Sequence, residues 1–157
     1  PKVLILGSMP GEESLGKRQY YAHPRNSFWF ILGRLLKFDP VVNYKKRKEI
    51  LKENNIALWD VLKACERKGS LDSSIIKASL IENEFLPFYA KYHTIRHVFF
   101  NGAMAEKEYE KRVLPVVRCK HRELQYIRLP STSPARASLT KEEKLAQWAI
   151  ILAKTQL

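Results

Sequence analysis

The sequence has few side chains that bind metals, and they are not clustered. The two cysteines, Cys65 and Cys119, lack C-x-x-C spacing. The four histidines are spread along the chain as His23, His93, His97 and His121. Zinc and iron–sulfur sites need several such ligands at recognisable spacings. The sequence therefore predicts a protein that binds no metal and uses no cofactor.

The sequence also lacks a long hydrophobic run. No apolar stretch approaches membrane-spanning length, and no leader pattern of charged, apolar and small residues opens the chain. Pro1 and Lys2 stand directly before an expected strand, so we expect that a few residues precede them. At 45% hydrophobic, residues 1–157 are predicted to form a single domain with a sizeable core. We therefore expect a soluble, cytoplasmic protein.

Acidic residues are scarce relative to basic ones. The chain has 28 Lys and Arg against 16 Asp and Glu, which gives a net charge of +12. A field of this size attracts polyanions, and nucleic acid is the first candidate. In a bacterial or archaeal cell, such a protein would associate with the nucleoid. The basic run 45–48 also fits a solvated helix face, so Lys17, Arg18, Arg25 and Arg136, near the expected site, are more informative.

Hydrophobic patterns along the chain alternate between strands and helices. Val3–Leu6 is typical of a strand buried on both faces, and further strands are expected at 56–61, 95–100 and 124–129. Helices are expected from 26 or 27 to 36, over 44–53, from a cap at Asn83 through 89, over 103–113, and after a capping box at 140–143. Residues 66–74 are expected to form a polar loop. This order predicts a three-layer α/β/α sandwich with a central, mostly parallel four-stranded sheet.

Three of the expected strands end in glycine-rich or polar segments. The first leads into Gly7-Ser8-Met9-Pro10-Gly11 and then into 20–29, the third ends at Asn101-Gly102, and the fourth leads into 130–138. Carboxyl ends of parallel strands share one edge, so these segments should line one cleft. Glycine lets main chain approach a ligand closely. The hydroxyl-rich 130–138 segment suits phosphate oxygens, although an ordinary turn before a helix has a similar composition.

In this order and separation, the motifs resemble the uracil-DNA glycosylase superfamily. The resemblance is carried by Gly7-Ser8-Met9-Pro10-Gly11, His23-Pro24-Arg25-Asn26-Ser27-Phe28-Trp29 and Ser131-Thr132-Ser133-Pro134, with 58–61 and 69–72 between them. It runs from Val3 to the last helix and is closest to the deoxyinosine (hypoxanthine) DNA glycosylase branch. It implies a monomeric enzyme of base excision repair that flips a damaged base out of double-stranded DNA and hydrolyses its N-glycosidic bond.

Departures from the uracil-specific relatives favour hypoxanthine as the substrate. Where mismatch-specific members have a water-orienting asparagine and most classical members an aspartate, this chain has Met9. We call 130–138 the late loop. Its family motif begins with Ser131, where uracil-specific members usually have histidine or asparagine. In the hypoxanthine branch, the water is oriented by the asparagine that matches Asn26, which is therefore the implied catalytic residue. A broader glycosylase for uracil or xanthine and a catalytically silent nucleic-acid-binding relative are the alternatives.

The resemblance also implies binding roles. The implied base-binding residues are Gly7, Ser8, Met9, Pro10, Tyr21, His23 and Asn101. The implied DNA-binding residues are Ser131, Thr132, Ser133, Pro134, Ala135 and Arg136. Tyr21 would stack on the base, and Asn101 has the donor and acceptor needed for N1–H and O6 of hypoxanthine. Arg136 would fill the gap left by the flipped base or contact a phosphate, and His23 would contact phosphate or base or be structural.

Several of these residues have structural interpretations as well. Asn26 could cap a helix, Tyr21 could fill the core with its hydroxyl exposed, and Asn101 could be a turn residue at a strand end. We interpret Asp60 and Asp72 as loop and capping residues and assign them no catalytic role.

Overall fold

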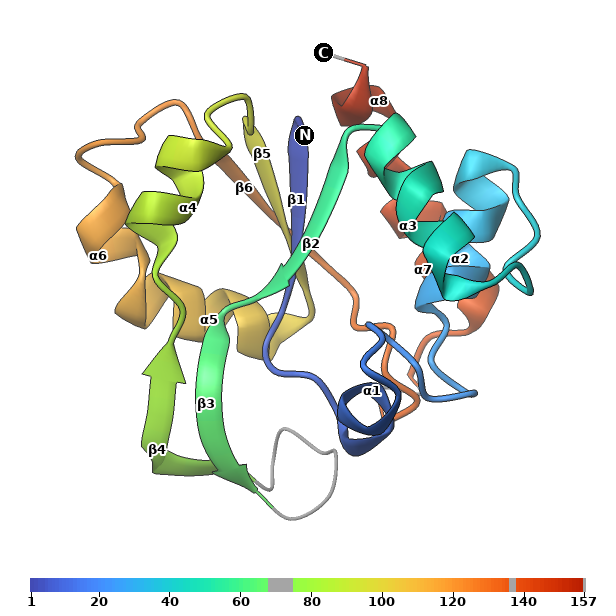
Figure 1. Ribbon diagram of the computed structural model, residues 1–157, viewed down its shortest axis with the longest axis horizontal. Coiled ribbons are helices and arrows are strands. Elements are labelled where there is room, and N and C mark those ends of the chain that lie inside the picture. Colours follow the sequence, from blue (N-terminus) through green and yellow to red (C-terminus); the bar gives the residue numbers. More distant parts are fainter. Residues whose placement is uncertain (68–74, 136–137, 157) are drawn as a thin grey trace.

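The computed structural model describes residues 1–67, 75–135 and 138–156. Its centre is a parallel sheet with the strand order β2-β1-β5-β6 (Figure 1). These strands are β1 (Val3–Gly7), β2 (Ile56–Asp60), β5 (His97–Asn101) and β6 (Gln125–Leu129). The predicted four-stranded parallel sheet is confirmed, and each predicted strand overlaps an observed one.

Helices cover both faces of the sheet (Figure 1). One face packs against α2 (Phe28–Leu36), α3 (Tyr44–Glu53), α7 (Lys141–Trp148) and α8 (Ile150–Thr155). The other packs against α4 (Phe85–Lys91), α5 (Ala103–Arg112) and α6 (Leu114–Val117). Successive strand residues point to opposite faces, so Val3 and Ile5 pack with the first group and Leu4 and Leu6 with the second. None of the helices in the described part of the chain has the length and apolarity that crossing a membrane requires.

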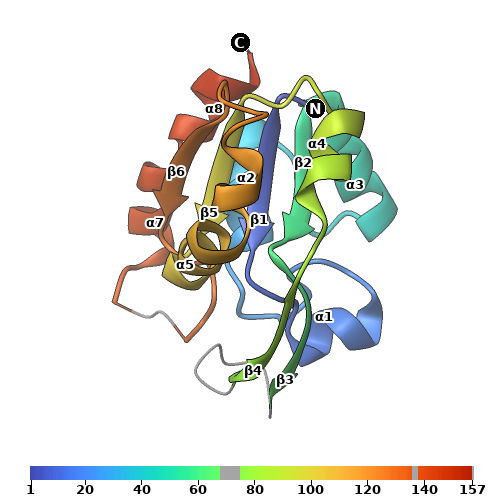
Figure 2. The same ribbon diagram turned by 90° about the vertical axis from the view of Figure 1, so that its left-hand side faces the viewer.

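An antiparallel hairpin that the sequence did not predict continues directly from β2. Its strands are β3 (Leu62–Arg67) and β4 (Ile75–Glu82), and it projects beyond the carboxyl end of the parallel sheet (Figure 2). The polar loop predicted over 66–74 is therefore wrong at residues 66–67, which belong to β3, and 68–74 lie outside the described residues. A short helix, α1 (Glu12–Lys17), follows the first loop and was not predicted either.

The predicted helix caps have different outcomes. The capping box at Thr140 is confirmed, because its Oγ1 accepts the N–H of Glu143 at 3.1 Å and its own N–H donates to Oε1 of Glu143 at 3.2 Å. The cap at Asn83 is wrong, since α4 begins after Glu84. The Nδ2 of Asn83 instead donates to the carbonyl of Asp60 at 2.8 Å, where β2 passes into the hairpin.

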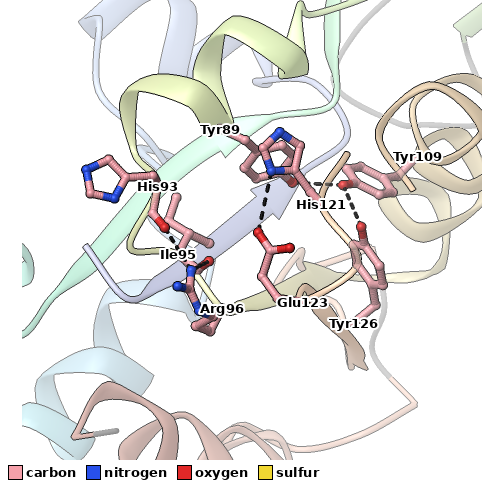
Figure 3. Close-up of polar contacts among 8 residues, drawn as sticks. All are labelled: Tyr89, His93, Ile95, Arg96, Tyr109, His121, Glu123 and Tyr126. Carbon is pink, nitrogen blue, oxygen red and sulfur yellow. Dashed lines mark hydrogen bonds and ion pairs between the residues drawn. The ribbon is translucent and has the colours of Figure 1, made fainter. Parts of the chain in front are cut away.

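A chain of tyrosine hydroxyls connects α4, α5 and β6 (Figure 3). The hydroxyls of Tyr89 and Tyr109 are 2.8 Å apart, and Tyr109 donates to Tyr126 at 3.2 Å. Burial raises the pKa of Tyr89 and of Tyr109 above the usual value for tyrosine. This network satisfies hydroxyl groups that would otherwise be unpaired in the core.

Candidate functional site

The carboxyl ends of the four parallel strands lie along one edge of the sheet. Gly7 at the end of β1 is in register with Asp60 at the end of β2, and Asn101 at the end of β5 is in register with Leu129 at the end of β6. We call this region the site edge. Open α/β sheets bind their ligands at this position.

A reciprocal pair of hydrogen bonds joins β5 to the loop after β6. The N–H of Thr132 donates to Oδ1 of Asn101 at 2.9 Å, and Nδ2 of Asn101 donates to Oγ1 of Thr132 at 3.0 Å. Beside this pair, Gly102 has φ +97°, and a Cβ there would lie 3.0 Å from Cβ of Ser131, so the close approach requires glycine. Besides these bonds the amide of Asn101 has one further N–H and one further lone pair, and the Tyr21 hydroxyl is a neighbour of this amide. The role of Asn101 as a base reader stays a prediction.

The segment before α2 is held against the same loop. The N–H and the Oγ of Ser27 donate to the carbonyl of Thr132 at 3.1 and 3.3 Å, and Thr132 is 1% exposed. Thr132 thus contacts β5 on one side and the start of α2 on the other. The predicted proximity of Asn101 and the loop after β6 is confirmed, and the start of α2 joins them through Ser27. That these segments and the Gly7 loop line one cleft stays a prediction.

Asn26 lies beside this junction and is half-buried. Its Oδ1 accepts the N–H of Phe28 at 3.0 Å, and its own N–H donates to the carbonyl of His23 at 2.9 Å. The residue at the N-cap position is Ser27, whose side chain makes no capping bond. Asn26 therefore helps to start α2, in agreement with the interpretation that it could cap a helix. It also keeps an NH₂ group and a lone pair with which to hold a water, and its catalytic role stays a prediction.

Tyr21 has a strained backbone and an unusual environment. Its φ of 55° lies in the left-handed region, which costs a residue other than glycine about 1–3 kcal/mol. Its ring stacks on Phe28, with centroids 4.0 Å apart, so one ring face at most is left for a base. Its hydroxyl is buried and has no hydrogen-bond partner among the described residues. Burial and the Asp60 carboxylate raise the pKa of Tyr21, and the neighbouring Asn101 side chain opposes them.

Asp60, which the sequence analysis interpreted as a loop or capping residue, is the last residue of β2 and lies at the site edge. A Cβ on Gly7 would lie 2.8 Å from Oδ1 of Asp60 and 3.3 Å from the hydroxyl of Tyr21, so these groups converge on the glycine. Asp60 is 8% exposed, and its charge raises the pKa of both Tyr20 and Tyr21, adding to the larger effect of burial. Its place at a strand end opposite Gly7 could have identified it. Asp72 lies outside the described residues.

The first loop uses its main chain to hold the start of the hairpin. The carbonyl of Gly7 accepts the N–H of Val61 at 2.9 Å, and the carbonyl of Ser8 accepts the N–H of Leu62 at 3.0 Å. Met9 is half-buried and packs against the core, and Pro10 is half-buried as well. The main chain of Gly7 and Ser8 therefore fixes the start of the hairpin next to the site edge. Base-binding roles for Gly7, Ser8, Met9 and Pro10 stay predictions.

His23 is oriented by a local hydrogen bond. Its Nδ1 accepts the N–H of Arg25 at 3.1 Å, so in the neutral ring the proton is on Nε2, where it can donate to a ligand. Arg25 is exposed, as are Lys17 and Arg18 at the end of α1. These cations give the site edge a positive rim.

The late loop has its carbonyls bonded to the protein and its serine hydroxyls available as donors. Oγ of Ser131 accepts the N–H of Ser133 at 3.2 Å, and Oγ of Ser133 accepts the N–H of Ala135 at 3.3 Å. Each hydroxyl hydrogen is thus left to donate elsewhere. Pro134 is half-buried and Ala135 exposed, and Arg136 lies outside the described residues. Such donors would suit an anion such as phosphate, and the DNA-binding roles of 131–136 stay predictions.

Within residues 1–67, 75–135 and 138–156, no group of three or more His, Cys, Asp or Glu side chains could hold a metal ion. The chemistry available at the site edge is that of amides, hydroxyls, one buried carboxylate and aromatic rings.

Comparison with known proteins identifies the family to which the chain belongs. Residues 1–154 match the family model of the uracil DNA glycosylase superfamily. The chain is 39% identical over 149 residues to the hypoxanthine DNA glycosylase of Methanosarcina barkeri, which covers 94% of this chain and 88% of that protein. It is 36% identical over 151 residues to the hypoxanthine DNA glycosylase of Methanosarcina acetivorans, and this match covers 96% of this chain and 89% of that protein.

The fold is also similar to that of a solved structure. A solution NMR structure of a Methanosarcina acetivorans protein, with the provisional description of a uracil DNA glycosylase, aligns with a TM-score of 0.79 and 34% identity. The alignment covers 99% of this chain and 91% of that one. The family model and these relatives extend over nearly the whole chain, and the match to the family model includes every segment of the site edge. The chain belongs to the uracil DNA glycosylase superfamily.

Proposed function

We propose that this protein is a monofunctional DNA glycosylase that releases hypoxanthine from deoxyinosine in DNA by hydrolysis. The observation that carries the proposal is the site edge itself, where the apolar Met9 leaves Asn26 as the side chain able to orient a water. The names of relatives that are 39% and 36% identical support hypoxanthine as the base. No metal or cofactor is required.

The reaction replaces the bond between the sugar carbon and the base nitrogen with a bond to water oxygen. The departing purine takes the bonding electrons and a proton, and the DNA keeps an abasic sugar. Because the transition state resembles an oxocarbenium ion, the enzyme needs a positioned water and a stabilising field. Asn26 would hold the water. The buried carboxylate of Asp60 would place negative charge at the same edge, where the sugar becomes positive.

Recognition of the base would combine stacking with hydrogen bonding. The flipped base would lie on the ring face of Tyr21 that Phe28 does not cover. The further N–H and lone pair of Asn101 would pair with O6 and N1–H of hypoxanthine. Adenine has an amino group where O6 is expected, and such an unmatched buried pair costs about 1–3 kcal/mol.

The DNA would be bound as a duplex containing one damaged base. The net charge of +12 attracts the backbone, and residues 131–135 would contact its phosphates. We expect the protein to act as a monomer in the cytoplasm.

A broader glycosylase is the second candidate, and one observation favours it. The two bonds to Thr132 fix the orientation of the Asn101 amide, which therefore presents the same donor and acceptor to any base with a lactam edge. Uracil and xanthine carry the same lactam pattern as hypoxanthine.

Release of the free base tests the proposal. Duplexes with one deoxyinosine, deoxyuridine or deoxyxanthosine are incubated with the protein, the abasic sites are cleaved with alkali, and the freed base is identified by chromatography. Free hypoxanthine and strand cleavage support the proposal. No release of any base would indicate the catalytically silent nucleic-acid-binding relative.

A further inference from the structure

Helix α7 places two donors one turn apart beneath the late loop. Nε1 of Trp148 donates to the carbonyl of Pro130 at 2.9 Å, and Nζ of Lys144 donates to the carbonyl of Ser133 at 3.5 Å. Residues four apart on a helix share one face, so both ends of the 130–133 segment are held by the same face of α7. Figure 2 shows α7 beside β6, from which this loop leaves.

Holding the loop does not account for the charge of Lys144. The residue is 5% exposed, and no carboxylate pairs with it among the described residues. Burial lowers the pKa of its ammonium group, and no neighbouring charge offsets this. A neutral donor would hold a carbonyl without the cost of burying a cation, as Trp148 does at the other end of the segment. The 3.5 Å distance to Ser133 is also at the long limit for a hydrogen bond.

The loop itself has donors suited to an anion. The carbonyls of Pro130, Thr132 and Ser133 all accept bonds from the protein. The hydroxyls of Ser131 and Ser133 accept main-chain N–H groups and so keep their hydrogens for a ligand. The ammonium of Lys144 and the hydroxyl donors of the loop would both interact favourably with an anion that binds to the loop.

We propose that Lys144 is a positioning residue whose buried charge supports the binding of one DNA phosphate by residues 131–135. It acts through the loop and does not touch the reacting atoms. Among the described residues the ammonium has no counter-ion, and the bound phosphate would supply one across the peptide layer. This inference rests on the DNA-binding part of the proposed function and does not depend on which base is excised.

The test separates the charge of Lys144 from its hydrogen bond. Lys144→Met removes both, Lys144→Gln keeps an N–H donor without charge, and Lys144→Arg keeps the charge. Lys120→Met is the control, because Lys120 is exposed and precedes the amino end of β6, at the opposite end of the sheet. Affinity for a fluorescein-labelled undamaged duplex is measured by anisotropy over a range of NaCl concentrations, and thermal unfolding of each variant is recorded.

The account predicts that Lys144→Met and Lys144→Gln weaken binding about fivefold at 0.15 M salt and reduce the log–log salt slope by about 0.9, the value for one phosphate contact. Lys144→Arg and Lys120→Met should stay close to the wild type. Because the ammonium pairs with no carboxylate among the described residues and its one hydrogen bond there is long, Lys144→Met should not lower the thermal transition. With a deoxyinosine duplex, the neutral variants should raise KM by a larger factor than they lower kcat.

Two results would overturn the inference. If both neutral variants keep the wild-type affinity and slope, the charge does not support DNA binding. If Lys144→Gln restores binding and Lys144→Met does not, Lys144 only pins the loop. Should Lys144→Met fail to fold, the comparison of Lys144→Gln, which lacks the charge, with Lys144→Arg, which keeps it, decides whether the charge supports DNA binding. Because the duplex is undamaged, a failure to excise hypoxanthine would leave these measurements valid, and an active enzyme with unchanged salt slopes would overturn this inference alone.

Discussion

Removal of the Asn26 side chain should reduce excision far more than it reduces stability. Among the described residues, the Asn26 side chain makes one hydrogen bond, from the N–H of Phe28 at 3.0 Å. Losing such a bond at a helix start costs about 0.5–2 kcal/mol of stability. Losing a group that stabilises the transition state costs about 2.7–4 kcal/mol, which lowers the rate by about 10²–10³-fold. Asn26→Ala should therefore fold and bind DNA but excise at least about a hundredfold more slowly.

The assay is single-turnover excision from a deoxyinosine duplex, with enzyme in excess so that weak binding does not limit the rate. Asn43→Ala is the matched control. Its Oδ1 caps α3 by accepting the N–H of Lys46 at 2.9 Å, so the same side chain and the same kind of bond are removed away from the site edge. The reasoning is refuted if Asn26→Ala, with a thermal transition like that of Asn43→Ala, excises at a near-normal rate.

Three further predictions concern charge, metal and pH. Affinity for undamaged duplex should fall steeply with salt, with a log–log slope of about −0.9 for each phosphate neutralised; a salt-independent affinity in anisotropy titrations would mean that the +12 charge serves another purpose. Excision should survive prolonged incubation with EDTA followed by dialysis, and loss of activity that Zn²⁺ or Mg²⁺ restores would contradict the amide-held water. Burial raises the pKa of Tyr89 and Tyr109, so their contribution to stability is complete below the unfolded value of about 10 and is lost as pH rises above it. Thermal transitions between pH 8 and 11 should show this loss, less steeply in Tyr109→Phe, and equal slopes would disprove it.

The parallel sheet was predictable because its strands are short, apolar and separated by helices. Val3–Gly7 and His97–Asn101 are almost wholly buried, and such runs between amphipathic helices leave few other arrangements. The capping box at Thr140 was predictable for a similar reason, since both of its bonds are local in sequence.

The features that were missed depend on contacts between distant residues. The hairpin formed by β3 and β4 is attached to α5 by Arg112, which bonds to Glu108 at 2.6 Å and lies 3.7 Å from Glu82. Asn83 was predicted to cap α4, but its amide reaches Asp60, 23 residues earlier. A local sequence pattern shows neither the pairing of Arg112 with Glu82 nor that of Asn83 with Asp60.

The same limit applies to the site edge. Sequence order indicated that the strand ends meet, and the reciprocal bonds between Asn101 and Thr132 place them together. The burial of Asp60 and the position of Lys144 beneath the loop were not predicted, because each depends on packing between elements far apart in the chain.

The central claim is that the enzyme prefers hypoxanthine, and a direct comparison of bases tests it. Duplexes of identical sequence, each with one deoxyinosine, deoxyuridine or unmodified deoxyadenosine, are compared under the same single-turnover conditions. The account predicts clear release of hypoxanthine, slower or no release of uracil, and no release of adenine. Faster excision of uracil than of hypoxanthine would contradict it.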